Sequence, residues 1–381
     1  MKVNENITIT QGDIPEIVKS CHRRLELQLK KLGHRRGLTM PMFMAVPGSG
    51  KTSIGAKLAD DLERLLFEDC AGNMMPGDAR IPAVDLEKQI AMYCGNKSYP
   101  FINTGTVKED DKVLMLWDEF LDASPIIQKI LKQATEANRL GDLRFAENTL
   151  HIAMTNGLEH ACNSERLGAA MANRTGFFEV APSVDVFQEW FTAANINVEA
   201  EALIASNTDM FYNIKFATWD GKSNFASFRT VTEMGMMFEA DYVTEEQDGS
   251  RTFDFKSDPL CRAKLQSILG QVSGTKAYAW LQLYDAIGSI ERILANPTTS
   301  RLPDDISKQW IVAVKLVGVA NESNLGAVME IATRLRGSKS FLEAFVARSI
   351  GKQKPNLQKE PALRSWMARE LDTLSGRSGS I

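Results

Sequence analysis

Cysteines and histidines are few in this sequence, and none of them are grouped. The five cysteines are scattered over 381 residues without a C-x-x-C pair, and none of the four histidines lies near a cysteine at ligand spacing. An odd number of scattered cysteines argues against a disulfide framework, and the lack of clustered ligands argues against a zinc site. We therefore interpret these residues as ordinary packing or surface residues.

Long apolar runs and an excess of positive charge are also missing. No stretch approaches the roughly 20 apolar residues that span a bilayer, and the first ten residues, MKVNENITIT, lack the apolar core of a signal peptide. We therefore expect a cytoplasmic protein. The formal net charge is −4, so the chain as a whole has no cationic field that would hold nucleic acid.

What the sequence does contain is an alternation of apolar runs and amphipathic segments, in a chain long enough for two or three cores. We expect buried strands at residues 40–46, 112–120 and 149–157, and helices at residues 13–33, 54–67, 84–94 and 124–140. Apolar strands that alternate with helices predict an α/β fold in which a parallel sheet is covered on both faces.

The composition changes after Pro182, and from there the pattern is mostly helical. The exception is the polar segment 243–258, which we interpret as a loop or a hairpin. Trp190, Trp280 and Trp310 lie on apolar helical faces, where we expect them to be core residues.

The stretch MFMAVPGSGKTS (42–53) joins a predicted strand to a predicted helix, which is the setting of a phosphate-binding loop. It differs from the usual G-x-x-x-x-G-K-[ST] pattern only at its first position, where Ala45 replaces glycine. The loop amides and the helix N-terminus would bind phosphate oxygens, and the lysine would reach the outer phosphates. The predicted nucleotide-binding residues here are Pro47, Gly48, Ser49, Gly50, Lys51, Thr52 and Ser53.

Two further strand ends carry polar side chains. The run VLMLWDEF ends in Asp118 and Glu119. We expect Asp118 and the Thr52 hydroxyl to hold Mg²⁺, and Glu119 to act as the general base that polarises the attacking water. The run TLHIAMTNG ends in Thr155 and Asn156. Asn156 is a candidate for orienting that water, although an asparagine before glycine is also typical of a plain turn.

These motifs together resemble one family. The ordered set AVPGSGKT, LMLWDEF, AMTNG, MANRTGFFEVAPS and FASFRTVTEM is similar to an AAA+ ATPase, and within that superfamily to the phage or prophage-type members of the MoxR-like branch. The resemblance covers roughly residues 10–290. It implies a P-loop AAA+ core with a parallel sheet, a mostly α-helical lid, a C-terminal helical region, and ATP and Mg²⁺ as ligands. A bacterial or phage-infected cytoplasm is the expected location.

The resemblance also implies roles for single residues. Asn156 matches the sensor-1 position, Arg174 the arginine finger that acts on a neighbouring subunit, and Arg229 the sensor-2 arginine of the lid. Arginine suits both of the latter roles because its planar fork stabilises charge on phosphate oxygens. Arg166 is a competing finger candidate, and Thr175-Gly176 stand where the family usually has a phenylalanine. A surface ion pair is the alternative interpretation of Arg174 and of Arg229.

A finger that acts in trans implies a ring of identical subunits, with a hexamer expected. The predicted divisions are a helical segment (1–38), the nucleotide-binding domain (39–182), the lid (183–295), a helical extension (296–374) and a disordered tail (375–381). The segment 95–105 matches an insertion that lines the pore of such rings. There Tyr99 and Phe101 would contact a substrate, unless they serve only as packing.

Three functions are compatible with this pattern. The resemblance favours a remodeller of protein complexes that acts with a separate von Willebrand factor A-domain protein. The alternative is a nucleic-acid motor or loader for replication, packaging or defence, supported by the basic cluster at residues 22–36. We interpret that cluster instead as the solvated face of a helix that buries its leucines, Leu25, Leu27, Leu29 and Leu32. The acidic pair after the second strand argues against the third possibility, a scaffold without activity.

Overall fold

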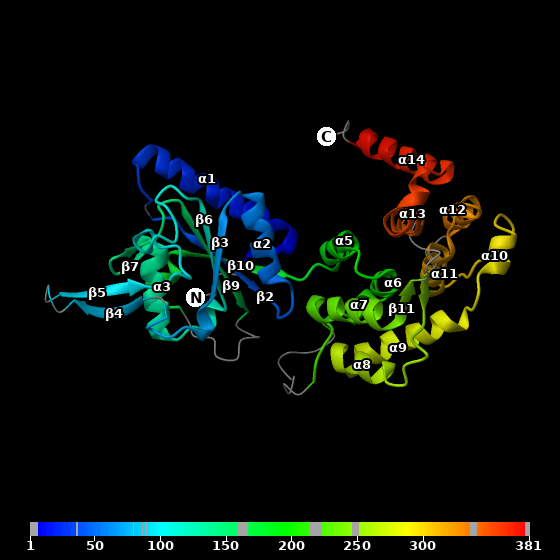
Figure 1. Cartoon of the computed structure of the whole chain (residues 1–381), viewed down its shortest axis with the longest axis horizontal. Coiled ribbons are helices and arrows are strands. Elements are labelled where there is room, and N and C mark those ends of the chain that lie inside the picture. The colour runs from blue at the N-terminus through cyan, green and yellow to red at the C-terminus, as the bar shows by residue number, and fades with distance from the viewer. Residues whose placement is uncertain are drawn as a thin grey trace. The chain divides into compact units, whose positions relative to one another are not determined.

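The computed structural model describes residues 7–35, 37–78, 80–85, 87, 90–157, 167–212, 223–245, 251–335 and 341–377. The chain divides into two compact units, residues 1–183 and 184–381, and each is described by itself (Figure 1). In the described part of the chain, no helix is both long and apolar enough to cross a membrane.

A six-stranded sheet organises the first unit. Its spatial order is β1-β10-β2-β9-β6-β3, and every neighbouring pair is parallel. The predicted α/β class, a parallel sheet flanked by helices and followed by a helical region, is confirmed. The strands are β1 (Ile7–Thr10), β10 (Thr175–Ala181), β2 (Met40–Ala45), β9 (Thr149–Asn156), β6 (Val113–Asp118) and β3 (Leu65–Cys70).

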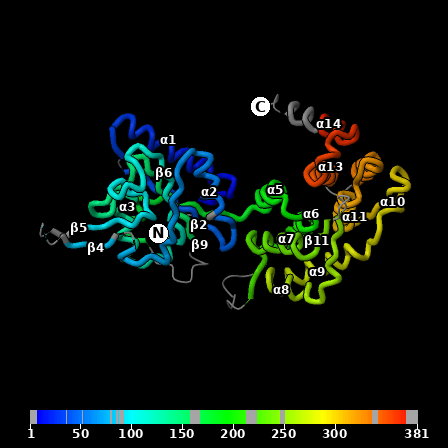
Figure 2. Tube along the Cα trace, viewed as in Figure 1, coloured from blue at the N-terminus to red at the C-terminus, as the bar shows by residue number. Residues whose placement is uncertain are grey.

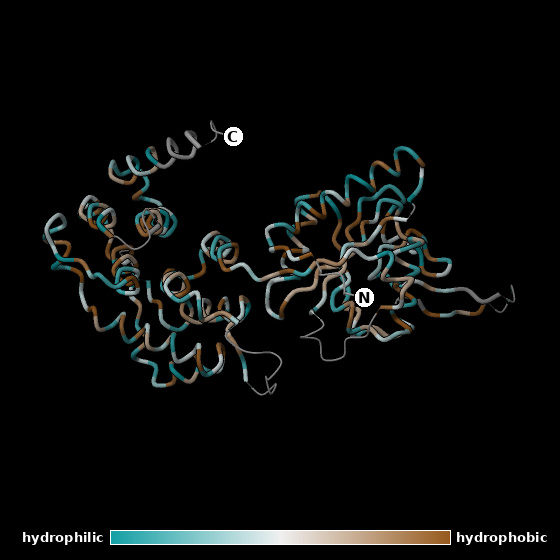
Figure 3. Tube along the Cα trace, turned by 180° about the vertical axis from the view of Figure 1, so that it is seen from behind, coloured by the Kyte–Doolittle hydropathy of each residue, from teal (hydrophilic) through white to brown (hydrophobic). Residues whose placement is uncertain are grey.

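Alternate residues of the central strands pack against helices on opposite faces. Phe43 packs in one cluster with the apolar residues of α1 (Ile14–Leu32) and α2 (Lys51–Asp61). Its neighbour Met42 packs in the other cluster, with those of α3 (Pro125–Ala137). The central strands are accordingly hydrophobic along much of their length, as the brown colour in Figure 3 indicates. Burial on both faces explains why these strands read as continuous apolar runs.

Helix α1 agrees with its predicted span. Gly33 ends it in the left-handed conformation, with φ +72°, where its N–H bonds to the Leu29 carbonyl. The expectation that its four leucines are all buried is wrong, because Leu27 and Leu32 are 50% and 52% exposed. Fewer leucines of α1 than expected face the core, and Leu25 is one that does.

Two predicted helices are wrong. The segment 54–67 is not one helix, because α2 ends at Asp61 and the edge strand β3 begins at Leu65. The segment 84–94 is not helical either. It belongs to the antiparallel hairpin of β4 (Arg80–Asp85) and β5 (Ile90–Gly95), which projects away from the sheet (Figure 1).

The segment after this hairpin packs inward. Tyr99 and Phe101 are only 2% and 0% exposed, and Phe101 stacks on Tyr99 and contacts Phe145. A short 3₁₀ turn (Ile102–Thr104) follows. Within this chain the two aromatic rings therefore serve as packing and are not presented to a substrate.

The second unit is a helical array with one large core that runs from Phe187 to Trp366 (Figure 2). Segment 243–258 contains the hairpin of β11 (Val243–Glu245) and β12 (Arg251–Phe253), as one of our two interpretations predicted. The helices are α5 (Val184–Ala194), α6 (Val198–Ser206), α7 (Phe228–Tyr242), α8 (Cys261–Leu269), α9 (Gln271–Ala286), α10 (Glu291–Ala295), α11 (Ile306–Val319), α12 (Leu325–Arg334), α13 (Phe341–Gln353) and α14 (Pro361–Arg377).

The tryptophans of this unit follow the prediction in two cases out of three. Trp280 and Trp310 are buried in the core, whereas Trp190 on α5 is 46% exposed. The division of the second unit into a lid and an extension stays a prediction. Helix α14 continues past Leu374 into the segment expected to be a disordered tail, and residues 378–381 lie outside the described part.

The turn between α8 and α9 depends on a glycine. Gly270 has φ +79°, and a Cβ there would lie 2.1 Å from the carbonyl oxygen of Asn224. We predict that Gly270→Ala lowers the free energy of unfolding by about 2 kcal/mol or more, because backbone strain adds to the clash. Gly326→Ala is the control, since Gly326 is helical with open space around it and should change stability by less than about 1 kcal/mol. Equal effects of both substitutions in chemical denaturation would contradict this account.

Candidate functional site

The loop from Val46 to Gly50 joins the carboxyl end of β2 to the N-terminus of α2. Gly48 and Gly50 have φ values of +73° and +83°, which side chains rarely adopt, so the glycines allow the loop to fold back on itself. The bond from the Ile54 N–H to the Gly50 carbonyl (3.2 Å) closes the first turn of α2. The N–H groups at the start of a helix have no acceptor within that helix, and they can bind an anion.

Two side chains in this loop fit a phosphate group. Ser49 is only 5% exposed, and its Oγ has no hydrogen-bond partner among the described residues. Lys51 donates from Nζ to Asn156 Oδ1 (2.8 Å) and to the Val46 carbonyl (3.3 Å). A buried hydroxyl without a partner, beside a lysine and glycine amides, is a set of donors suited to phosphate oxygens. Pro47 precedes these glycines in the loop, and Ser53 is exposed on α2.

The acidic pair stands at the end of β6, the strand that pairs directly with β9. Asp118 ends β6, and its Oδ1 accepts the N–H of Glu119 (2.9 Å). Glu119 has a left-handed backbone, with φ +50°. The Asp118 carboxylate is of a type suited to Mg²⁺. The side chain of Thr52, the other predicted metal ligand, lies outside what the structure describes.

Cys70 holds the carboxylate of Glu119, and sequence reasoning missed this contact. Cys70 ends β3 in register with Asp118, and its thiol donates to Glu119 Oε2 (2.9 Å). Burial, the hydrogen bond to Glu119 and the negative charge of Glu119 raise the pKa of the Cys70 thiol to about 11. Gly72 leaves room for this carboxylate, because a Cβ at Gly72 would lie 3.1 Å from Glu119 Oε2.

The two polar residues at the end of β9 have different environments. Thr155 is fully buried, and its Oγ1 accepts the Leu121 N–H (3.2 Å), which fixes the chain just after the acidic pair. Asn156 pairs with Ala45 in the sheet and is partly exposed next to Lys51. Of the two, Asn156 is therefore the one with access to a ligand.

Arg174 lies at the amino ends of the strands, whereas the loop lies at their carboxyl ends. It stands just before β10, and its carbonyl accepts the N–H of Met40, the first residue of β2. Six residues of strand, roughly 17–20 Å, separate this end from the loop at the other end of β2. Its guanidinium pairs with Glu136 of α3 (2.7 Å) and donates to the Ala170 carbonyl of α4 (Ala169–Ala172).

The structure therefore brings the loop, Asn156, Asp118 and Glu119 together at the carboxyl ends of the strands. Arg174 lies at the amino ends. Arg229 lies on α7 of the second unit, so its predicted role is not placed against the loop. Arg166, the competing finger candidate, lies outside the described residues. The grouped residues can bind a phosphorylated ligand and offer a carboxylate base to water beside it.

No model of a protein family matches this sequence, and no curated protein matches it. The structure is similar to a closed-state cryo-EM reconstruction of Hsp104 with ATPγS and FITC casein, at 14% identity and TM-score 0.37, over 61% of this chain and 44% of that one. It is also similar to the S. cerevisiae Hsp104–ADP complex, at 14% identity and TM-score 0.34, over 52% and 41%. The chain spans less than half the length of either Hsp104 chain.

The contact between Cys70 and Glu119 predicts a measurable change in thiol reactivity. At pH 8 a thiol with a pKa of about 11 is almost wholly protonated, so Cys70 should react slowly with iodoacetamide. Glu119→Gln removes the negative charge that helps to raise this pKa, and the Cys70 rate should rise several-fold. Mass spectrometry of the labelled peptides gives the rates, with the exposed Cys94 as the internal control. An unchanged Cys70 rate in the variant would contradict the contact.

Proposed function

We propose that this chain is an ATP-hydrolysing AAA+ ATPase of the MoxR-like type, from a phage or bacterial cytoplasm, that works as a ring, most simply a hexamer, and remodels a protein partner. The observation that carries the proposal is the contact between Lys51 and Asn156 across β2 and β9. It joins the phosphate-binding loop to the strand beside Asp118 and Glu119. The groups proposed to bind phosphate and the carboxylate proposed to act as the base then lie at the same end of the sheet.

The roles of the residues follow from these positions. The amides of residues 48–52 and Lys51 bind the phosphates, and Asp118 with Thr52 would hold Mg²⁺. When bound, Mg²⁺ offsets the charge of the phosphates. Glu119 accepts a proton from the attacking water, and Asn156 orients that water. Since the Cys70 thiol donates to Glu119 Oε2, this bond has to be released before that oxygen can serve as the base.

The position of Arg174 supports action on a neighbouring subunit. It lies at the edge of the sheet away from its own loop, so it cannot reach a nucleotide bound there. In a ring, the same edge would face the loop of the next subunit. Arg174 would then exchange Glu136 for phosphate oxygens, to which its planar fork is suited. Arg229 on α7 is the proposed sensor-2 residue of the lid.

A protein substrate is favoured over nucleic acid, and a separate von Willebrand factor A-domain protein is the proposed partner that delivers it. The alternative, a nucleic-acid motor or loader, depends on the basic residues of α1. Arg23, Lys30 and Lys31 are exposed there. Arg35, however, donates to the carbonyls of Thr149 and Thr135, so it is not available to bind phosphates of nucleic acid.

The first experiment traps the partner. Glu119→Gln should leave ATP bound while lowering hydrolysis by a factor of about 100 or more, because the general base is lost. The tagged variant is recovered from lysate with ATP, and the bound material is analysed for protein and for nucleic acid. Lys51→Ala in the same background is the control, since it removes phosphate binding.

The outcomes separate the two functions. A stoichiometric protein that is absent from the Lys51→Ala control supports the remodeller. Nucleic acid that depends on Lys51 supports the motor, and Arg23, Lys30 and Lys31 would be substituted next. ATP bound by Glu119→Gln and hydrolysed at the original rate would refute the role of Glu119.

Mixing two inactive variants tests whether Arg174 acts on the nucleotide of a neighbouring subunit. Lys51→Ala subunits retain Arg174 but cannot bind nucleotide, and Arg174→Ala subunits bind it but lack the finger. We expect each variant alone to lose activity and the mixture to regain a measurable fraction, because mixed rings contain complete sites. Arg139→Ala, a substitution of another exposed arginine in the first unit, should remain active alone. The idea fails if co-purified mixtures stay inactive, or if specific activity is unchanged on dilution to monomers.

A further inference from the structure

The second unit contains an open cavity of about 1020 Å³. This volume is at the upper end of the range of small-molecule sites. The carboxyl ends of three helices, α9, α11 and α13, line it together with β12 and the residues that follow this strand. Its walls belong to one unit, and nothing proposed above uses it.

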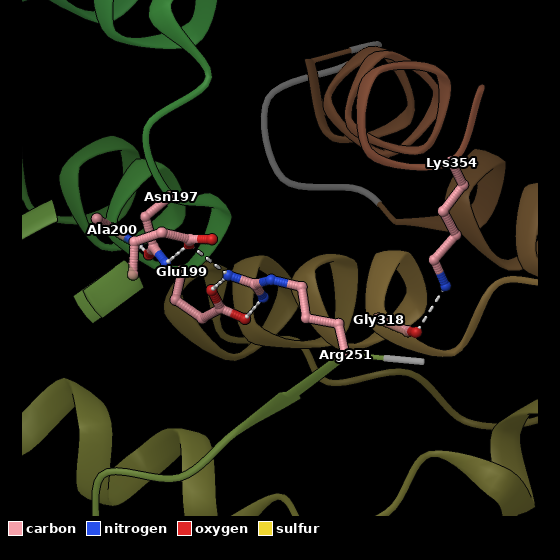
Figure 4. A network of polar contacts seen from close by, with 7 residues as sticks. Asn197, Glu199, Ala200, Arg251, Gly318 and Lys354 are labelled. Atoms are coloured by element: carbon pink, nitrogen blue, oxygen red, sulfur yellow. Dashed lines mark hydrogen bonds and ion pairs between the residues drawn. The ribbon is translucent and has the colours of Figure 1, made fainter. Parts of the chain in front are cut away.

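Several charged groups in the wall already have partners. Arg251 donates to both oxygens of Glu199 (2.6 and 2.8 Å) and to Glu239 (3.0 Å), as Figure 4 shows in part. Burial opposes the charge of Arg251, but the hydrogen bonds and charges of the two glutamates outweigh this and raise its pKa. Lys256 pairs with Asp285. These groups are balanced without a ligand.

Two lysine ammonium groups in the wall contact carbonyl oxygens and not carboxylates. Lys354 donates to the carbonyls of Gly318 (2.8 Å) and Ala320 (2.6 Å), and Figure 4 shows it reaching toward Gly318. Lys315 donates to the Gly288 carbonyl (2.8 Å) and lies 4.3 Å from the ring centre of Tyr284. Both are half-buried, and neither is in a direct ion pair among the described residues, although the charge of Asp285, which pairs with Lys256, also acts on Lys315. A half-buried charge without a counter-charge is costly.

Both lysines line the same cavity, near the carboxyl end of α11. Lys354 bonds carbonyls at that end, and Lys315 reaches from α11 to the Gly288 carbonyl after α9. Lys315 is three residues before Gly318, and residues three apart lie next to each other on a helix surface. One function of these lysines is to bond carbonyls at the ends of α9 and α11, where the helix dipole is negative. An ammonium group has three N–H donors, and neither lysine uses all of them on the described residues. Gln353, also in the wall, has a buried Oε1 with no partner among those residues.

We propose that this cavity binds a small molecule with a phosphate monoester, whose phosphate is held between Lys315 and Lys354. A phosphate dianion would give each of these lysines a direct ionic partner. Lysine binds phosphate as a compact point charge. The remaining volume would hold the body of the molecule against Tyr284. The site is independent of the phosphate-binding loop, so it would allow a metabolite to bind without competing for that loop.

Amine labelling of the full-length protein tests this site residue by residue. Inorganic phosphate is the probe, added in the millimolar range at constant ionic strength, and acetylation of each lysine is followed by mass spectrometry. Burial lowers the pKa of Lys315 and of Lys354, and a bound phosphate would favour the charged, unreactive form of each amine. We expect phosphate to slow both reactions with the same midpoint, while the exposed Lys308 on α11 labels at a constant rate.

A substitution then tests whether the two lysines form one site. Lys315→Met should raise the phosphate concentration that protects Lys354 by about tenfold, which corresponds to the loss of one charged hydrogen bond. Lys308→Met is the matched control on the same helix and should leave the midpoint unchanged. If phosphate protects neither lysine, or if Lys354 is protected equally well in Lys315→Met, the lysines only close helix ends and the proposal is wrong. Unchanged circular dichroism would show that each variant is folded.

Discussion

The parallel pairing of β9 between β2 and β6 is the constraint on which the first unit depends. Strands that run in the same direction end at the same edge, so this pairing places Asn156 between the phosphate-binding loop and the acidic pair. The same constraint explains Arg174, which precedes a strand and therefore lies at the other edge. A single set of backbone hydrogen bonds thus decides which of these side chains lie together in one chain and which lie apart.

The sequence predicted the parts of the fold in which a segment has one clear environment. Strands β2, β6 and β9 are buried on both faces, and their apolar runs were recognisable for that reason. Strand β3 was missed because it is an edge strand of mixed burial, and only residues 62–64 separate it from α2, so helical spacing seemed to continue through it. The β4–β5 hairpin was missed because its strands project from the body of the unit and show no inward apolar pattern.

The same distinction applies to the candidate site. The loop around Lys51 and the acids after β6 were predictable because each motif is local and carries its own geometry. Cys70 was not, because its importance depends on β3 lying beside β6, and a lone cysteine outside any predicted element gives no signal. The sequence also could not show which of Thr155 and Asn156 is buried. Adjacent residues of a strand point to opposite faces, and only the packing shows which face is covered.

The charged side chains differ in whether their partners are charged or neutral. Arg251 lies between two carboxylates, and the buried Glu199 binds two nitrogens of its guanidinium group. Lys315 and Lys354 instead donate to neutral carbonyl oxygens, which water or a ligand can replace at little cost. Phosphate oxygens form stronger, charge-assisted bonds to the same donors. Groups that hold the fold together are therefore paired with opposite charge, whereas lysines held by neutral oxygens remain able to exchange them for an anion.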